Sequence, residues 1–206
     1  MSHLSVYRLS ANRRSWSAPA CFSTLTRPEY LPFVEAVRPG FMAGISLEMR
    51  EGARPREFQC FPLYSVLLAL DNPTVTLLSL DIEGAEFDVF RSLPWDKVDI
   101  EVIVTELVHA GEVFPGSRLE IIQYLESKNY QWVGNLFDDI FVRKDLLGVK
   151  YNIDVKDAER QFPLFSSDPS LESQDILDKY FSFWGNKRSP SNGVTPWTQY
   201  IWPKKP

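Results

Sequence analysis

The stretch Val75–Glu86, VTLLSLDIEGAE, decides the fold of this chain. Val75–Leu80 is a short and almost continuous apolar run, which is typical of a strand buried on both faces of a parallel sheet. A polar turn ends the run, and a helix is predicted over Ala85–Ser92, before Pro94. A strand, a turn and a helix therefore follow one another in order.

Outward from this stretch, the chain repeats the pattern of a strand followed by a helix. Val98–Leu107 is the next β-rich run, and a helix is predicted over Ser117–Lys128. Tyr130–Val133 and Ile140–Val142 are predicted as two further strands around the polar turn 134–139, forming a closing antiparallel hairpin. This alternation predicts an α/β fold with a mostly parallel sheet and helices on both faces.

The two ends of the chain have weaker patterns. Phe58–Phe61 is predicted as a strand and Pro62–Leu70 as a helix, whereas residues 27–56 are predicted as loop with a short strand near Gly44–Met49. One more helix is predicted to begin at Asp168, which proline follows. We therefore divide the chain into an N-terminal region (1–57), a core (58–145) and a C-terminal extension with an aromatic, proline-rich tail (146–206).

The composition disfavours several classes of protein. Of the 206 residues, 44% are hydrophobic and 24% are charged, as in an ordinary folded domain. The net charge is −5, and residues 58–145 hold six basic against fifteen acidic side chains. We expect no nucleic-acid partner, because phosphate binding needs a basic face. The longest uncharged apolar run, Phe58–Leu70, has 13 residues, whereas a membrane span needs about 20, so we expect no span in this chain.

The chain has two cysteines, Cys21 and Cys60. They are too few for a disulfide framework and lack the paired spacing of a zinc site, so no metal centre is predicted. Both lie on predicted strands. In an oxidising compartment they would form one disulfide, and in the cytosol they would be small buried thiols. The sequence leaves these alternatives open.

Acidic side chains gather where the strand predicted over Val75–Leu80 ends. Asp81, Glu83 and Glu86 follow this strand, at the edge where ligands of open α/β sheets bind, and Gly84 permits a sharp turn. This group is predicted to bind a cation, orient an acceptor hydroxyl or contact a cofactor. In the structural alternative, Glu83 and Glu86 complement the helix dipole and Asp81 accepts hydrogen bonds from backbone amides.

A further acidic residue, Glu106, ends the next predicted strand and would lie beside Asp81 if the two strands are neighbours. His109 follows three residues later, and a carboxylate with an imidazole could serve as general base and acid. A lone histidine in a loop is more often an ordinary surface residue. The chain has no G-x-G-x-x-G, Walker, His-Glu-x-x-His or Gly-x-Ser-x-Gly motif, which disfavours phosphate-loop proteins, zinc proteases and esterases.

Leu78–Phe90, LSLDIEGAEFDVF, resembles the Asp-x-Glu-Gly-x-Glu signature of the FkbM family of S-adenosylmethionine-dependent methyltransferases. The resemblance covers roughly residues 7–145. It implies a partial Rossmann-like class I methyltransferase fold, S-adenosylmethionine as cofactor, and transfer of a methyl group to a hydroxyl. Flanking segments are similar to the Star-like animal branch of this family: Asn12–Trp16, Ala18–Ser23, Cys60–Leu67 and Leu93–Trp95.

The strand-end positions and the resemblance together give a set of candidate site residues. They are Asp81, Glu83, Glu106 and His109 for catalysis, and Asp81, Gly84 and Glu86 for cofactor binding. In such folds a glycine-rich loop after the first strand and an acidic residue after the second hold the cofactor. Both are missing here, so we expect an N-terminally truncated domain with impaired cofactor binding. Whether the chain is an enzyme is left open.

The Star-like flanks imply a second hypothesis from another class of protein. The chain would be a non-catalytic module that binds client or cargo proteins during vesicle transport from the endoplasmic reticulum through the Golgi. Its location would be endoplasmic reticulum, Golgi and endosomal membranes, with the anchor absent here. Loss of the first two strands of the domain would also uncover a sheet edge. We expect either association through that edge or its coverage by the N-terminal loops or the aromatic tail.

Overall fold

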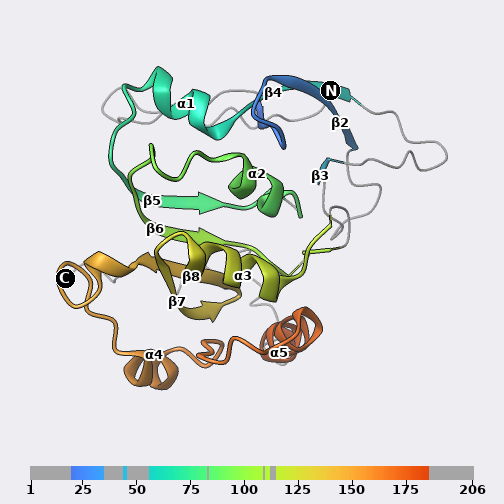
Figure 1. Cartoon of the computed structure of the whole chain (residues 1–206). Helices are drawn as coiled ribbons and strands as arrows, with labels where there is room; N and C mark the ends of the chain where they lie inside the picture. Colours follow the sequence, from blue (N-terminus) through green and yellow to red (C-terminus); the bar gives the residue numbers. More distant parts are fainter. Residues whose placement is uncertain are drawn as a thin grey trace, which may run out of the picture.

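The computed structural model describes residues 20–34, 44–45, 56–82, 84–108, 110–111 and 115–185. Strands and helices alternate along the chain and form two four-stranded sheets with helices packed around them (Figure 1). The predicted α/β class is confirmed, and the arrangement is consistent with a partial Rossmann-like methyltransferase fold. The division into two sheets was not predicted.

The first sheet is built by the N-terminal part of the chain and has the strand order β1-β4-β2-β3. β1 is parallel to β4, whereas β2 is antiparallel to both β4 and β3. The predicted strand at residues 58–61 is β4, which begins two residues earlier. The bounds are β1 Cys21–Phe22, β2 Glu29–Val34, β3 Gly44–Ile45 and β4 Arg56–Phe61.

The prediction that residues 27–56 form mostly loop is wrong for β2. This strand contains Pro32, a residue type that is depleted in strands. In the sheet, β3 pairs with only Phe33 and Val34, so among the described residues Pro32 has a strand partner on one side alone. Such an edge-like environment tolerates proline, because a missing N–H group costs no ladder hydrogen bond on the open side.

The second sheet carries the predicted core and has the order β5-β6-β8-β7. β5 and β6 are parallel, and the β7–β8 hairpin adds to β6 through an antiparallel pair with β8. The predicted hairpin is therefore confirmed. The bounds are α1 Leu63–Ala69, β5 Val75–Leu80, α2 Glu86–Ser92, β6 Ile100–Thr105, α3 Arg118–Ser127, β7 Tyr130–Leu136 and β8 Asp138–Arg143.

Three details of this sheet differ from the sequence prediction. A mostly parallel sheet was expected, but only the β5–β6 pair is parallel, whereas the β6–β8 and β7–β8 pairs are antiparallel. β5 was expected to be buried on both faces, but it is the outermost strand of its sheet, and Leu77 is 56% exposed. The turn predicted over residues 134–139 is much shorter, because only Phe137 separates β7 from β8. Asp138 and Asp139 therefore belong to a strand and not to a solvent-exposed turn.

The hydrophobic core holds α2 and α3 against the second sheet. Leu80 of β5, Phe90 of α2, Ile103 of β6 and Leu125 of α3 are all fully buried in one cluster. Burial of such side chains contributes roughly 1.5–3 kcal/mol each. This packing fixes the ends of β5 and β6, from which the candidate site projects.

The C-terminal extension contains a short 3₁₀ helix, Lys144–Leu146, and two α-helices, α4 (Val155–Gln161) and α5 (Ser173–Gly185). The helix predicted to begin at Asp168 begins instead at Ser173. The Asp168 carboxylate accepts hydrogen bonds from the backbone N–H and the hydroxyl of Ser170, which closes a turn and not a helical N-terminus. The aromatic tail, residues 186–206, lies outside the described residues.

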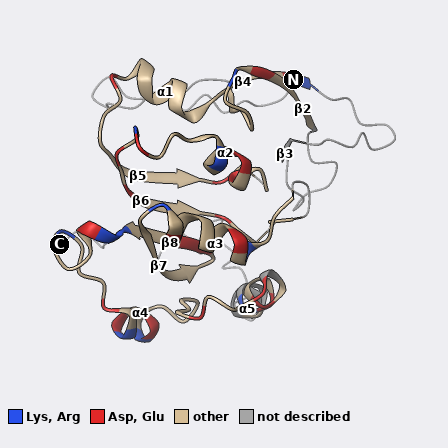
Figure 2. Ribbon diagram, viewed as in Figure 1, with Lys and Arg blue, Asp and Glu red and all other residues tan. Residues whose placement is uncertain are grey.

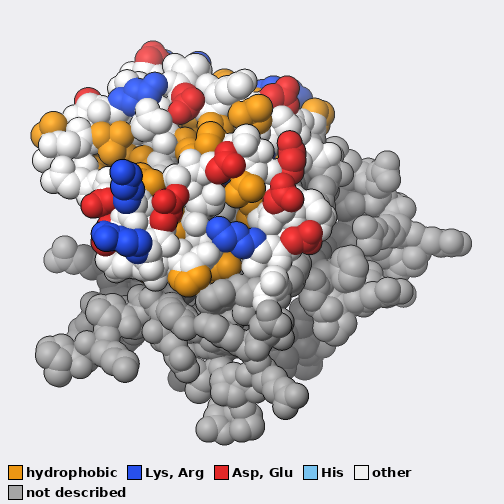
Figure 3. Space-filling model, turned by 90° about the horizontal axis from the view of Figure 1, so that it is seen from below, with side chains coloured by type: hydrophobic (Ala, Val, Ile, Leu, Met, Phe, Trp, Pro, Cys, Tyr) orange, Lys and Arg blue, Asp and Glu red, His pale blue; other side chains and the backbone are white. Residues whose placement is uncertain are grey.

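Charged side chains are distributed over both sheets and their helices (Figure 2). On the side of the molecule where α4 and α5 lie, acidic, basic and hydrophobic side chains are interspersed (Figure 3).

Within the part of the chain that the structure describes, no helix has the length and apolar character needed to cross a bilayer.

The two cysteines form a disulfide, so the alternative of free thiols does not apply to this structure. Cys21 of β1 lies directly opposite Cys60 of β4 in a parallel pair, with their Cα atoms 4.3 Å apart. The bond closes a loop over a sequence separation of 39 residues. It therefore ties the short strand β1 to the rest of the first sheet.

Candidate functional site

The carboxyl ends of β5 and β6 lie side by side. Leu80, the last residue of β5, pairs with Thr105, the last residue of β6, and the Glu106 N–H group donates to the Leu80 carbonyl over 3.3 Å. Asp81 and Glu106 are thus the first residues beyond two neighbouring strands, which is the arrangement that the sequence predicted. The Asp81 side chain is exposed, whereas Glu106 is only 8% exposed.

Glu86 lies at the start of α2 and is almost completely buried, at 1% exposure. Its Oε1 accepts a hydrogen bond from the Ile82 N–H group over 2.8 Å, and burial raises its pKa above the ordinary value despite that hydrogen bond. Gly84, also buried, has a φ of +100°, which the turn requires and which other residues rarely adopt. These contacts favour a structural role for Glu86 over a role in ligand binding.

Asp138 joins this edge from the hairpin. Because β8 is antiparallel to β6, the start of β8 meets the end of β6, and Asp139 pairs with Thr105. Burial raises the pKa of Asp138 to about 6, and the negative charges of Asp81 and Asp139 add to the shift. A carboxyl group that titrates near neutral pH is suited to general acid–base chemistry.

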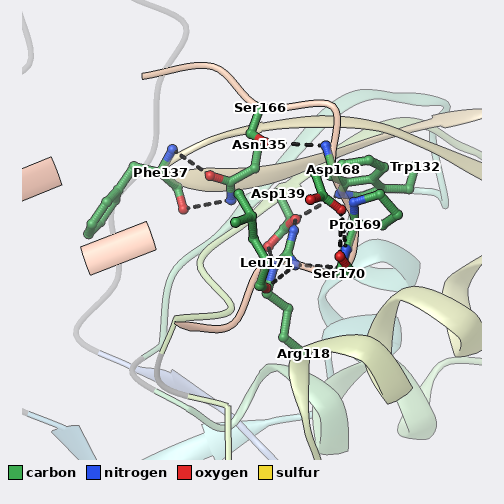
Figure 4. A network of polar contacts seen from close by, with 10 residues as sticks. All are labelled: Arg118, Trp132, Asn135, Phe137, Asp139, Ser166, Asp168, Pro169, Ser170 and Leu171. Atoms are coloured by element: carbon green, nitrogen blue, oxygen red, sulfur yellow. Dashed lines mark hydrogen bonds and ion pairs between the residues drawn. The ribbon is translucent and has the colours of Figure 1, made fainter. Parts of the chain in front are cut away.

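Asp139 is held by a buried polar network (Figure 4). Arg118, at the start of α3, donates two hydrogen bonds to its carboxylate, from Nε over 2.9 Å and from Nη2 over 2.6 Å. Trp132 Nε1 donates a third over 2.7 Å. Arg118 is 5% exposed and Asp139 is fully buried, so this bidentate pair is structural and is not available to a ligand.

The same arginine attaches the C-terminal extension to the edge of the sheet. Arg118 Nη1 donates to the carbonyls of Pro169 and Leu171 over 2.9 and 2.8 Å. Asn135 of β7 and Ser166 exchange two backbone hydrogen bonds of 2.8 Å each, which adds a short antiparallel bridge. The extension is therefore an integral part of the fold around the hairpin.

The side chain of Asn135 also shapes the tip of the hairpin. Its Oδ1 accepts from the Phe137 N–H group over 3.1 Å, and its Nδ2 donates to the Phe137 carbonyl over 3.0 Å. Phe137 has a φ of +76°, a conformation that needs such local support. These contacts fix the backbone directly before Asp138, from which the Asp138 side chain projects.

Two of the predicted site residues, Glu83 and His109, lie outside the described residues, so their roles stay predictions. Sequence reasoning missed Asp138, since the residue was assigned to a polar turn. Its position at the edge depends on how the hairpin returns to β6, which no local pattern indicates. Within the described ranges, no group of three or more His, Cys, Asp or Glu side chains could hold a metal ion.

One buried polar atom at this edge has no partner among the described residues. Thr105 is 1% exposed, and its hydroxyl makes no hydrogen bond to them. It lies at the end of β6, next in sequence to Glu106. A buried hydroxyl without a partner costs roughly 1–3 kcal/mol. Such unpaired groups are common at functional sites and are not a feature of optimised packing.

The comparisons identify the family. A family model described as the methyltransferase FkbM domain matches residues 20–132, more than half of the 206-residue chain. Neither the comparison with curated proteins nor that with solved structures gives a match. The matched span runs from the start of the described chain into β7 and includes Asp81 and Glu106. The chain belongs to the methyltransferase FkbM domain family.

Proposed function

We propose that this chain is an FkbM-type methyltransferase domain that uses S-adenosylmethionine and methylates a hydroxyl group. The observation that carries the proposal is the acidic edge within the family match, where Asp81 and Glu106 follow adjacent strand ends. Ligands of open α/β sheets bind at this kind of edge. When bound, the cofactor supplies an electrophilic methyl group on a sulfonium sulfur.

The residues of the edge have distinct roles in this proposal. Asp81 is exposed and accepts hydrogen bonds from amino or hydroxyl groups of the cofactor. Asp138, whose pKa is raised to about 6, accepts the proton that the acceptor hydroxyl loses. Glu106 and the Thr105 hydroxyl, which is unpaired among the described residues, orient the ligand from the end of β6. Catalytic roles for Glu83 and His109 stay predictions.

The residues present fit the cofactor only in part, and we propose that its binding is weak. A dissociation constant of 1 μM corresponds to about 8 kcal/mol. A hydrogen bond to a charged group contributes roughly 1.5–3 kcal/mol, so one exposed carboxylate cannot supply this affinity. The sequence has no G-x-G-x-x-G loop to add backbone contacts.

Calorimetric titration with S-adenosylmethionine tests the proposal. We expect saturable binding that Asp81→Ala weakens by about tenfold, equivalent to roughly 1.4 kcal/mol for the lost hydrogen bond. Asp96→Ala is the matched control, because Asp96 is also exposed but precedes β6 at the opposite end of that strand. Absence of binding heat, or an equal effect of both variants, would contradict the cofactor role of Asp81.

The second candidate function is a non-catalytic, Star-like module that binds client proteins during transport through the endoplasmic reticulum, Golgi and endosomes. The Cys21–Cys60 disulfide supports it, because such bonds persist in oxidising compartments and are rare in the cytosol. The sequence also lacks the glycine-rich loop that would hold the cofactor, which favours a non-catalytic module.

Fractionation of cells that express the tagged full chain, with alkylation of free thiols, tests this candidate. A cytosolic protein with two reactive thiols would contradict it.

We also propose that a longer form of the chain completes the second sheet. The strand order ends at β5, and β5 has a strand partner only in β6 among the described residues. Natural proteins usually pair or cover exposed strand edges, so additional strands would pair with the free edge of β5. The transcript upstream of Met1 tests this, since it either encodes further strands in frame or carries a stop codon.

A further inference from the structure

An open groove lies between the loop that follows β1 and the outer side of α2. It is lined by two arginines, Arg27 and Arg91, together with hydroxyl side chains and Asp88, and has a volume of about 450 Å³. Pockets for small ligands usually measure about 300–1,000 Å³. Figure 2 shows both basic and acidic residues on the ribbon of α2. The groove uses none of the residues assigned to the methyltransferase site.

Arg91 is held in a defined orientation while its hydrogen-bond donors stay unused among the described residues. Its guanidinium stacks on the ring of Phe87 at 3.7 Å from the centroid. The nearest carboxylate atom, Asp88 Oδ1, is 3.8 Å from Nη1, which is longer than a hydrogen bond. The stacked guanidinium therefore presents N–H groups at a fixed place, an arrangement suited to an oxyanion.

Arg27 enters the groove from a loop that its own polar contacts hold in place. The Thr24 N–H group donates to Glu29 Oε1 over 2.9 Å, and the Leu25 N–H group donates to Ser23 Oγ over 3.0 Å. The disulfide fixes β1, from which this loop starts. The Arg27 side chain has no ion-pair or hydrogen-bond partner in the part of the chain that the structure describes.

We propose that this groove binds the phosphate group of a small phosphate monoester, held between Arg27 and Arg91. Two guanidinium groups against one carboxylate leave the groove positively charged in a chain whose net charge is −5. Planar guanidinium donors match phosphate oxygens in pairs, and the Thr26 hydroxyl provides a further contact. The groove is open, so the organic part of the ligand extends toward solvent.

Asp88 sets the affinity of this site. Its carboxylate lies in the groove beside Arg91 and opposes an anion. Burial raises the pKa of Asp88 above its ordinary value, while the nearby Arg91 charge opposes the rise. Replacement of the carboxylate by an amide should therefore improve phosphate binding without emptying the groove.

Titration of the full chain with glucose 6-phosphate at pH 7.5, followed through the Arg Nε–Hε signals in NMR spectra, tests the proposal. We expect saturation with a dissociation constant on the order of 1 mM. Arg27→Gln and Arg91→Gln should each weaken binding about tenfold, since each removes charge-assisted hydrogen bonds. Asp88→Asn should strengthen it about threefold. Unchanged far-UV spectra verify that the variants are folded.

Arg160→Gln is the matched control, because Arg160 is 74% exposed on α4 and outside the groove, and its loss changes the net charge equally. It should leave binding unchanged. Titration with glucose, which lacks the phosphate group, tests the ligand chemistry and should give binding at least about tenfold weaker. No saturable shift with glucose 6-phosphate, equal binding of glucose, or an equal effect of Arg160→Gln would overturn the proposal.

Discussion

Asp138 stands at the start of β8 with its carboxyl group partly buried beside the Asp81 carboxylate. Burial and this negative charge raise its pKa to about 6, so the folded protein keeps the proton to a higher pH than the unfolded chain. The protonated carboxyl therefore stabilises the fold below about pH 4, and this contribution is lost as the pH rises through about 6.

The charge of Asp138 should thus cost stability at neutral pH. We predict that Asp138→Asn raises the free energy of unfolding at pH 7.5 by about 1–2 kcal/mol, after allowance for solvent screening. The gain should be much smaller at pH 4, where the carboxyl is protonated in the folded state and about half protonated in the unfolded chain. Urea denaturation at the two pH values measures this, with exposed Asp96→Asn as control. A gain that is independent of pH would contradict the prediction.

At the level of secondary structure, β7 depends on Gly134. The register between β7 and β8 shifts between Trp132 and Gly134, and Gly134 has a φ of +154°. A Cβ atom there would come within 2.1 Å of Cζ of Phe165, from the C-terminal extension. Glycine therefore allows the extension to pack directly on the backbone of β7.

Gly134→Ala should destabilise the protein by about 3 kcal/mol, because Phe165 must move and the hairpin loses this contact. Gly148→Ala is the matched control: Gly148 has a φ of +74°, but among the described residues no atom lies within 4 Å of the place that a Cβ would take. The control should cost only about 1 kcal/mol from backbone strain. Urea denaturation measures both. Equal losses would show that the Phe165 contact is unimportant.

The disulfide is the second feature at this scale, since β1 contributes only two residues to its sheet. Closure of a loop with a sequence separation of 39 residues should stabilise the fold by about 4 kcal/mol through the chain entropy of the unfolded state. We predict this loss for Cys21→Ala/Cys60→Ala in urea denaturation. Mass spectrometry of the unreduced wild-type protein after alkylation is the control, and two modified thiols would contradict the bond.

At the level of the whole molecule, the free edge of β5 is the main unsatisfied feature among the described residues. The strand is outermost in its sheet, and Leu77 at its centre is 56% exposed. Exposed strand edges with apolar side chains promote pairing between chains. The association through a sheet edge that we expected from the sequence is therefore assigned to β5 as a proposal.

We predict concentration-dependent self-association that Leu77→Lys reduces, because a charge on an edge strand opposes pairing. Light scattering after size-exclusion chromatography measures the mass as a function of concentration. Leu119→Lys is the matched control, since Leu119 is 49% exposed but lies on α3. A monomer at all concentrations, or an equal effect of both substitutions, would contradict a role for the β5 edge.

The sequence by itself was sufficient for features whose causes are local. The bounds of β5 follow from one apolar run, and α3 begins where Ser117 and Glu120 form a capping box. Within each of these elements the determining residues lie within a few positions of one another, so periodicity and capping indicate them directly. The sequence placed Asp81 and Glu106 side by side only on the condition that their strands are neighbours, and the parallel β5–β6 pair meets this condition.

Only the tertiary structure decided what the β7–β8 hairpin contributes to the core and to the candidate site. Asp139 looked like part of a polar turn, but Arg118, which lies 21 residues earlier in the chain, neutralises it and allows it to be buried in a strand. Asp138 reaches the candidate site because β8 returns antiparallel to β6. Partners so distant in sequence leave no local pattern, because the free energy of burying a charge depends on which group meets it after folding.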